Sequence, residues 1–334
     1  MFYRMALAVV GLSLAMPRVS ANTGGNNMLL VVEKGAQSLA IVDPASGHVV
    51  ASVPEGGVTG HEVAASPDGR LAYVPIYGNS GVGKPGTDGR MMVVIDVAVH
   101  KVVGEVDFGH GVRPHFVTVG PRDGLLYVTT ELDNTVTIVD PKTLQIVGSV
   151  PTGQAESHML VLSHDGRRGY TANVGPGTVS VLDMEARKTL AIIPVSGSTQ
   201  RIAISRDDRW VFTADQTQPR LAVIDTASNQ VKRWIALPGT GYGGAATPDG
   251  RWFLLALPGA HKLAVIDLGT MQVARTIDVP ATPQAVVVRP DGRRAYVSCD
   301  LSGQVAEIDL TDWTVARLIQ TGKLADGMAW AGSR

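Results

Sequence analysis

The chain has 334 residues, of which 45% are hydrophobic, and its formal net charge is −1. This balance provides no basic surface for nucleic acid or anionic lipid. A single cysteine, Cys299, excludes an internal disulfide, which a chain long enough to bury a large core does not need.

The first 21 residues have the features of a secretory signal. Arg4 precedes an apolar run over residues 5–16, and Val19-Ser20-Ala21 provides a small-x-small cleavage site. The run is too short to cross a bilayer, which takes about 20 apolar residues. We therefore expect cleavage after Ala21 and a periplasmic or secreted chain with no membrane attachment. The mature chain, residues 22–334, would carry 27 basic and 30 acidic side chains.

An apolar run that ends in aspartate recurs seven times along the mature chain. The spacings between successive aspartates are 53, 44, 43, 42, 42 and 42 residues. A near-constant period of this length is typical of a propeller or a solenoid. The seven aspartates are Asp43, Asp96, Asp140, Asp183, Asp225, Asp267 and Asp309.

Each period contains four short apolar runs, and the third repeat shows them most clearly. Its runs cover residues 115–119, 125–129, 135–139 and 145–150, with Gly, Pro, Asp and Asn between them. Runs rich in β-branched residues between such turns indicate strands, and four strands in about 42 residues is the content of one propeller blade. We expect the acidic turn residues to be structural.

The two ends of the mature chain complement each other. It begins with a second-type strand at residues 28–33 and finishes with a first-type strand near residues 327–330. The last strand can therefore complete the first blade, which removes exposed sheet edges. The sequence predicts a single all-β domain: a seven-bladed β-propeller with four antiparallel strands per blade, closed by the C-terminal strand.

The second strands carry a resemblance to a known family. They read Tyr127-Val-Thr-Thr130, Tyr170-Thr-Ala-Asn173, Phe212-Thr-Ala-Asp215 and Tyr296-Val-Ser-Cys299. Together with Pro-Asp-Gly before and Val-Ile-Asp after, this pattern resembles the bacterial YVTN-repeat β-propeller family over nearly the whole mature chain. The resemblance implies the propeller fold, and the family includes lactonase-like hydrolases and exported propellers.

One position at the entry to each first strand is polar in all seven repeats. In a propeller the first strands line the central channel, so these residues should gather at one channel mouth. The positions are 54, 43, 42, 42, 42 and 42 residues apart. They are occupied by His61, His115, His158, Gln200, Tyr242, Gln284 and Asp326.

Three histidines on adjacent blades form the sharpest signal. Imidazole is a common ligand of transition metals, and His61, His115 and His158 with an open position could hold a divalent metal and its bound water. Histidines in a water-filled channel could equally contribute to ligand binding without a metal. No cofactor is certain from the sequence, and a divalent metal is the one that the pattern allows.

Other polar residues should border the same mouth. A carboxylate there could orient a histidine or act as a general base, and an arginine could pair with an anionic ligand or with the neighbouring acids. Besides the three histidines, the catalytic candidates are Glu62 and Glu156. The ligand-binding candidates are Arg113, Glu131, Asn173, Gln200, Arg201, Asp215, Tyr242, Gln284, Asp300 and Asp326.

The second repeat is about eleven residues longer than the others. Its surplus, residues 79–89, falls between the second and third strands. We expect it to project over the mouth next to His61 and His115 as a lid or a partner-binding loop.

Three functions are compatible with this pattern. The first is an exported, monomeric propeller that binds a small molecule or a protein partner at the mouth. The second is a hydrolase or lyase, lactonase-like by resemblance, that uses a metal or the histidines. The third is a redox accessory protein that holds copper or haem. The sequence has no Cys-x-x-Cys-His attachment site and no Gly-x-Ser-x-Gly elbow, and we expect Cys299 to be buried and unreactive.

Overall fold

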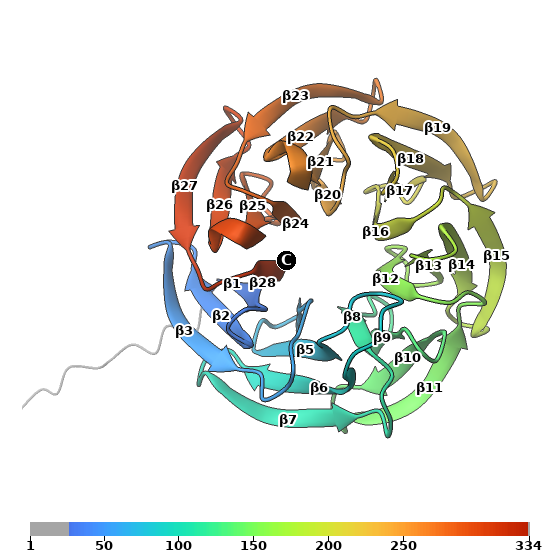
Figure 1. Cartoon of the computed structure of the whole chain (residues 1–334), viewed down its shortest axis with the longest axis vertical. Coiled ribbons are helices and arrows are strands. Elements are labelled where there is room, and N and C mark those ends of the chain that lie inside the picture. Colours follow the sequence, from blue (N-terminus) through green and yellow to red (C-terminus); the bar gives the residue numbers. More distant parts are fainter. Residues whose placement is uncertain (1–26, 333–334) are drawn as a thin grey trace, which may run out of the picture.

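The structure is a computed structural model that describes residues 27–332, so the expected signal segment lies outside the described residues. Within this range the chain forms seven four-stranded antiparallel sheets arranged around a central axis (Figure 1). The predicted seven-bladed β-propeller is confirmed. No helix of the described residues is long and apolar enough to cross a membrane.

The blades follow one another around the ring in chain order (Figure 1). Blade 1 contains β28 (Ala325–Ala331), β1 (Met28–Glu33), β2 (Ser38–Asp43) and β3 (His48–Pro54). Blade 2 contains β4 (Ala64–Ala65), β5 (Leu71–Gly78), β6 (Asp88–Asp96) and β7 (Lys101–Asp107). Blade 3 contains β8 (Pro114–Val119), β9 (Leu126–Thr130), β10 (Thr135–Asp140) and β11 (Gln145–Pro151).

The remaining four blades have the same order of strands. Blade 4 contains β12 (Ser157–Leu162), β13 (Arg168–Asn173), β14 (Thr178–Asp183) and β15 (Lys188–Pro194). Blade 5 contains β16 (Thr199–Ile204), β17 (Trp210–Asp215), β18 (Arg220–Asp225) and β19 (Gln230–Ala236). Blade 6 contains β20 (Gly244–Ala246), β21 (Trp252–Leu257), β22 (Lys262–Asp267) and β23 (Gln272–Asp278). Blade 7 contains β24 (Pro283–Val288), β25 (Arg294–Cys299), β26 (Gln304–Asp309) and β27 (Thr314–Gln320). Short 3₁₀ turns connect the second and third strands of blades 6 and 7, at η1 (Pro258–Ala260) and η2 (Asp300–Ser302) respectively.

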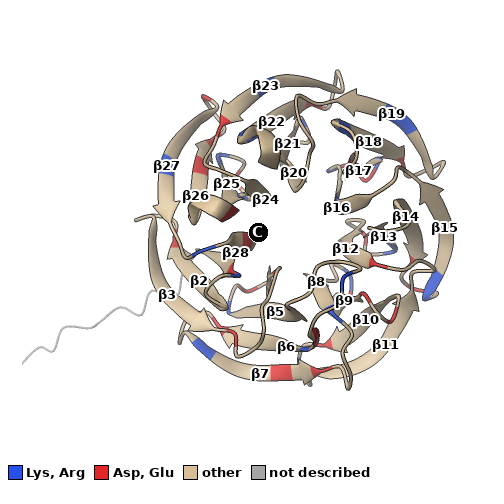
Figure 2. Ribbon diagram, in the orientation of Figure 1, with Lys and Arg blue, Asp and Glu red and all other residues tan. Residues whose placement is uncertain are grey.

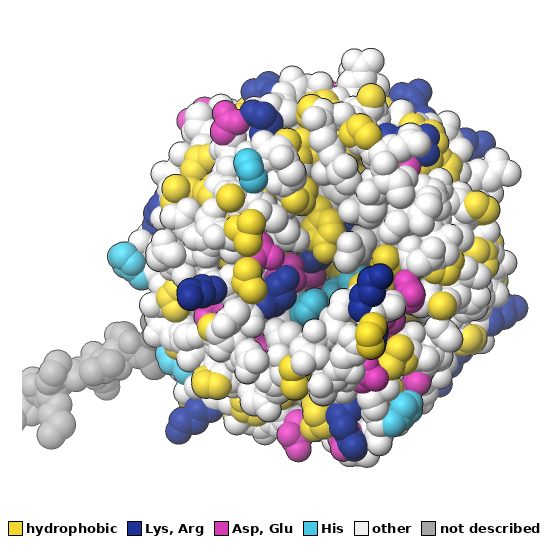
Figure 3. All heavy atoms as spheres, in the orientation of Figure 1, with side chains coloured by type: hydrophobic (Ala, Val, Ile, Leu, Met, Phe, Trp, Pro, Cys, Tyr) yellow, Lys and Arg dark blue, Asp and Glu magenta, His cyan; other side chains and the backbone are white. Residues whose placement is uncertain are grey.

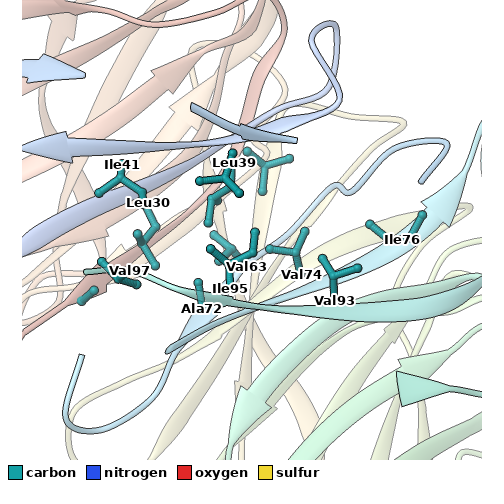
Figure 4. Close-up of a cluster of buried hydrophobic side chains, with 13 residues drawn as sticks. Leu30, Leu39, Ile41, Val63, Ala72, Val74, Ile76, Val93, Ile95 and Val97 are labelled. Carbon is teal, nitrogen blue, oxygen red and sulfur yellow. The ribbon is translucent and has the colours of Figure 1, made fainter. Parts of the chain in front are cut away.

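The core lies between the blades. Second and third strands are buried on both faces, because neighbouring blades cover them, and they therefore read as nearly continuous apolar runs. Figure 4 shows one such cluster, in which Leu30 and Ile41 of blade 1 pack with Val74 and Ile95 of blade 2. The outer fourth strands alternate between exposed and covered residues, as in β3.

The repeated aspartates close the hairpins between third and fourth strands. The Asp43 carboxylate accepts hydrogen bonds from the backbone N–H of Ala45 at 3.0 Å and of Ser46 at 3.3 Å. The other six aspartates accept the same kind of bond from the residues that follow them. These carboxylates stabilise turns, as the sequence predicted.

The ring closes through the two ends of the chain. Strand β28 pairs antiparallel with β1, with Met28 opposite Ala331 and Val31 opposite Met328. Acidic and basic residues are distributed around the ring, with neither sign gathered on one side (Figure 2). Closure places the entries to all seven first strands around one end of the channel, which we call the mouth.

Candidate functional site

The predicted histidines meet at the mouth. The imidazoles of His115 and His158 stack with centroids 3.5 Å apart, and His61 approaches His115 edge-on at 5.3 Å. Tyr77, which belongs to β5, packs against all three rings at centroid distances of 4.9 to 5.9 Å. Figure 3 shows histidine and charged side chains in the hollow at the centre of this face.

All three imidazoles are held neutral by burial. Desolvation lowers the pKa of His61 to about 4 and lowers the pKa of His115 well below its usual value. Burial also lowers the pKa of His158, although the neighbouring Glu131 carboxylate opposes this shift. Within residues 27–332 the buried Nδ1 of His115 has no hydrogen-bond partner. The mouth therefore contains neutral imidazole nitrogens, and one of them, His115 Nδ1, is buried without a hydrogen-bond partner among the described residues.

The three rings do not form the metal site that their spacing allowed. Among the residues that the structure describes, no group of three or more His, Cys, Asp or Glu side chains is arranged to hold a metal ion. The reason is geometric: His115 and His158 face each other ring to ring, 29° from parallel, whereas the nitrogen lone pairs that bind a metal lie in the ring planes.

Glu131 connects the histidines to the neighbouring charges. Its carboxylate accepts a hydrogen bond from the Tyr77 hydroxyl at 2.7 Å and lies 3.3 Å from His158 Nδ1 and 3.5 Å from Arg113 Nη1. Burial opposes ionisation, but these partners, His158 first among them, lower the pKa of Glu131. Glu131 is therefore a buried anion that holds the His158 ring in place.

A second charged cluster also borders the mouth. Arg201, only 6% exposed, pairs with Glu62 and, at 3.0 Å, with Asp326, and it lies over the Tyr242 ring. Burial raises the pKa of Glu62 to about 7 despite the guanidinium. Asp326 is also buried, but Arg201 and Lys34 lower its pKa. Two carboxylates thus share one guanidinium, and Glu62 is the one that accepts a proton more readily.

Lys34 extends this cluster to the last blade. Its ammonium lies 3.0 Å from Asp326 and 3.5 Å from Asp300, and its side chain keeps 22% exposure. Beside this cluster, a hollow of about 300 Å³ is lined by Tyr242 and Gln284, among others. Gln200 is half-buried at the start of β16.

The inserted loop lies across this face and is held by Arg113. Arg113 donates from Nη2 to the Lys84 carbonyl at 2.7 Å and from Nε to Asp88 at 2.6 Å. Glu156 lies so close to Gly83 that a Cβ there would come within 2.6 Å of its Oε1. The loop therefore reaches from blade 2 to blades 3 and 4, and Arg113, like Arg201, is paired with the acids of its own chain.

Two predicted mouth residues face elsewhere. The amide of Asn173 bonds with Ser157, Thr178 and Ser180 inside blade 4. The Asp215 carboxylate bonds with Thr217 and Arg220 at the end of β17. Both residues are the last of a second strand, whereas Glu131 comes one residue after one. Successive side chains of a strand point to opposite faces, so a shift of one residue turns the side chain away from the mouth.

The same register accounts for the two residues that the sequence analysis missed. Lys34 and Tyr77 occupy the position that Glu131 and Asp300 occupy in their own blades. Their separations, 43 residues from Lys34 to Tyr77 and 54 from Tyr77 to Glu131, follow the repeat. Comparing this second position across all blades would have found them.

Part of the chain matches a known family model. Residues 119–243 match the cytochrome D1 heme domain. This stretch is well under half of the chain, and it includes Glu131, His158 and Arg201. No curated protein matches the chain in sequence.

Solved structures with a similar fold include proteins of known and unknown function. The chain is 19% identical to dihydro-heme d1 dehydrogenase NirN in complex with DHE, with a TM-score of 0.66 over 95% of this chain and 77% of that one. It is 18% identical to Kuenenia stuttgartiensis hydrazine synthase, with a TM-score of 0.51 over 78% and 97% of the two chains. A functionally unknown protein from Desulfotomaculum acetoxidans gives a TM-score of 0.77 at 12% identity, over 92% and 100%. These similarities support the propeller fold, and none of them names the YVTN repeat.

Proposed function

We propose that this propeller binds a haem-related tetrapyrrole at its mouth, with a mouth histidine as the ligand of the iron. The observation that carries the proposal is the Glu131–His158 pair beside the unpaired Nδ1 of His115. This proposal makes the general expectation of a small ligand at a histidine-lined mouth more specific, and it favours the haem alternative over the metal-assisted hydrolase.

The donor set fits a haem iron. Because Glu131 is an anion, His158 directs an Nδ1 proton towards it, which leaves Nε2 with a lone pair. Histidines that bind metals are commonly oriented in this way by a carboxylate, and histidine is a frequent axial ligand of haem. One imidazole is sufficient for that role, so the missing three-ligand metal group does not count against it. When bound, the iron tetrapyrrole would supply electron-transfer or ligand-binding chemistry.

The mouth also contains basic groups suited to the acidic substituents of a tetrapyrrole. Lys34 follows the second strand of blade 1, and Arg113 precedes the first strand of blade 3, two residues from His115. Each is now paired with carboxylates of the chain, and guanidinium and ammonium groups both bind ligand carboxylates. Tyr242, which is only partly buried, provides aromatic surface nearby.

The comparisons support the same ligand class. The stretch similar to the cytochrome D1 heme domain contains both Glu131 and His158. The name of one similar structure, dihydro-heme d1 dehydrogenase, refers to a haem d1 compound. By contrast, no contact among the described residues specifically favours a lactonase-like hydrolase.

Titration with hemin tests the proposal. We expect the purified chain to bind hemin with a shifted Soret band that reports imidazole ligation. His158→Ala should abolish that shift or weaken binding at least tenfold, and His48→Ala, an exposed histidine on β3, should change nothing. If the spectrum stays that of free hemin, or if both variants behave like the unmodified chain, the proposal is wrong.

A further inference from the structure

A separate cavity lies between blades 5 and 6, at the end of the blades that is opposite the mouth. It has a volume of about 480 Å³, within the range of small-molecule sites. Blade 5 contributes residues of β17, β18 and β19 to its lining, and blade 6 contributes the turn between β22 and β23. The mouth residues precede first strands, so the turns between third and fourth strands lie at the other end of each blade.

Three exposed cations line this cavity. The guanidinium carbon of Arg209 lies 4.6 Å from the centroid of the Trp210 ring, and Lys232 and Arg233 are consecutive residues of β19. Within residues 27–332 none of the three forms an ion pair with an acidic side chain. Asp225 also lines the cavity, but its Oδ1 already accepts hydrogen bonds from the turn that follows it. Three cations and one carboxylate leave the lining with a formal charge of +2.

The equivalent place in blade 7 shows how the propeller pairs such a cation. Arg317 in β27 lies opposite Glu307 in the third strand, just as Arg233 in β19 lies opposite Val223. Arg317 donates from Nε to the Glu307 carboxylate at 2.8 Å and from Nη2 to the Pro44 carbonyl of the next blade at 2.7 Å. In blade 7 the guanidinium is therefore matched by an acid of its own chain.

Blade 5 has the guanidinium without the acid. Val223 stands where Glu307 stands in blade 7, so the third strand offers Arg233 no carboxylate. Leu268 holds the turn position of Pro44, and both it and Arg233 line the cavity. Because a guanidinium fork matches a carboxylate, a carboxylate from outside the chain can take the place that Glu307 takes in blade 7.

We propose that this cavity binds a small dicarboxylate. One carboxylate pairs with Arg233, as Glu307 pairs with the equivalent arginine of blade 7, and the other pairs with Arg209. Two negative charges match the charge of the lining. The carbon chain between them lies along the apolar side chains of Leu268 and Met271. The site lies away from the mouth and does not depend on the proposed tetrapyrrole.

Adipate is a suitable probe, and hexanoate is its singly charged counterpart. In the full chain with ¹⁵N-labelled tryptophan and ¹³C-methyl-labelled methionine, adipate should shift the signals of Trp210 and Met271 saturably. Trp330 and Met92, which do not line the cavity, should stay in place. Hexanoate should bind at least tenfold more weakly. The proposal fails if neither lining residue responds, if all tryptophans and methionines shift alike, or if hexanoate binds as tightly as adipate.

A pair of matched variants tests the role of Arg233. Arg233→Ala gives blade 5 the residue type that blades 1 and 4 carry at this position, and it should weaken adipate binding at least tenfold. Arg275→Ala removes the equivalent arginine of blade 6, which does not line the cavity, and should leave binding unchanged. Unchanged binding in Arg233→Ala, or equal losses in the two variants, would overturn the assignment.

A third variant supplies the missing acid from within the chain. Val223→Glu places a carboxylate opposite Arg233, as in blade 7, and should weaken adipate binding because the guanidinium is then already paired. Undiminished binding in a folded Val223→Glu variant would contradict the proposal. If that variant does not fold, the comparison of Arg233→Ala with Arg275→Ala still decides.

Discussion

Arg201 should contribute more to stability than any exposed ion pair of the molecule. In Arg201→Met the Glu62 and Asp326 carboxylates lose their shared guanidinium while they remain buried. Breaking a buried ion pair from one side costs about 3–5 kcal/mol. We expect the lower end of that range, about 3 kcal/mol, because Lys34 still faces Asp326 and Glu62 can accept a proton.

The pH dependence of this loss follows from Glu62. Burial already raises the pKa of Glu62 to about 7, and removal of the guanidinium raises it further. A carboxyl whose folded pKa lies above its unfolded value adds stability at low pH and loses it as the pH rises through the folded pKa. The deficit of Arg201→Met should therefore be larger at pH 8 than at pH 6.

Urea denaturation followed by circular dichroism measures both effects. Arg90→Met is the matched control, because its pair with Asp107 is about half exposed, is screened by water and should contribute little to stability. Arg201→Met/Glu62→Gln should recover part of the loss, since it removes one unpaired charge. A deficit for Arg201→Met no larger than that of the control, or no recovery in the double variant, would refute the reasoning.

Three further predictions concern the mouth, the loop and the closure of the ring. Burial lowers the pKa of His61 from 6.5 to about 4, so the unfolded chain binds the extra proton and stability falls as the pH drops through this window. Between pH 7 and pH 4.5, denaturation curves should show that the free energy of unfolding of His61→Gln falls by up to about 3 kcal/mol less than that of the unmodified chain. Equal decreases would contradict the assignment. Arg113→Met removes the bonds to the loop, so hydrogen exchange at residues 79–87 should accelerate at least tenfold, unlike in Arg90→Met; unchanged protection would show that other contacts hold the loop. Deleting residues 325–334 exposes the edge of β1 and should give aggregated or multimeric protein on size exclusion, whereas a monodisperse monomer would show that closure is dispensable.

The fold could be predicted almost completely because its signals are local and repeated. Turn residues and β-branched runs placed the strands of blade 3 within about a residue of β8 to β11. The period then set the number of blades, and the strand types at the two ends predicted that β28 pairs with β1. None of these steps required knowledge of a side-chain contact.

The site could be predicted only for residues that occupy equivalent positions in successive repeats. The period brought His61, His115 and His158 to one mouth, because equivalent positions in a ring share one end. The period could not give the angle between their rings, because that angle depends on packing against Tyr77. The stacked arrangement of His115 and His158 is what excludes the metal geometry. The prediction that Asn173 faces the mouth was wrong, because a shift of one residue along a strand turns the side chain to the opposite face.

The most direct test of the account is the protonation of the histidines. Eight histidines are present, and ¹⁵N chemical shifts of the imidazoles report the charge of each one. We predict that His61, His115 and His158 become charged only at pH values below the usual histidine pKa, about 6.5, because burial lowers the pKa of each ring, and that hemin perturbs the His158 signals. Eight histidines that all become charged near the usual pKa, about 6.5, would show that no buried imidazole cluster exists at the mouth.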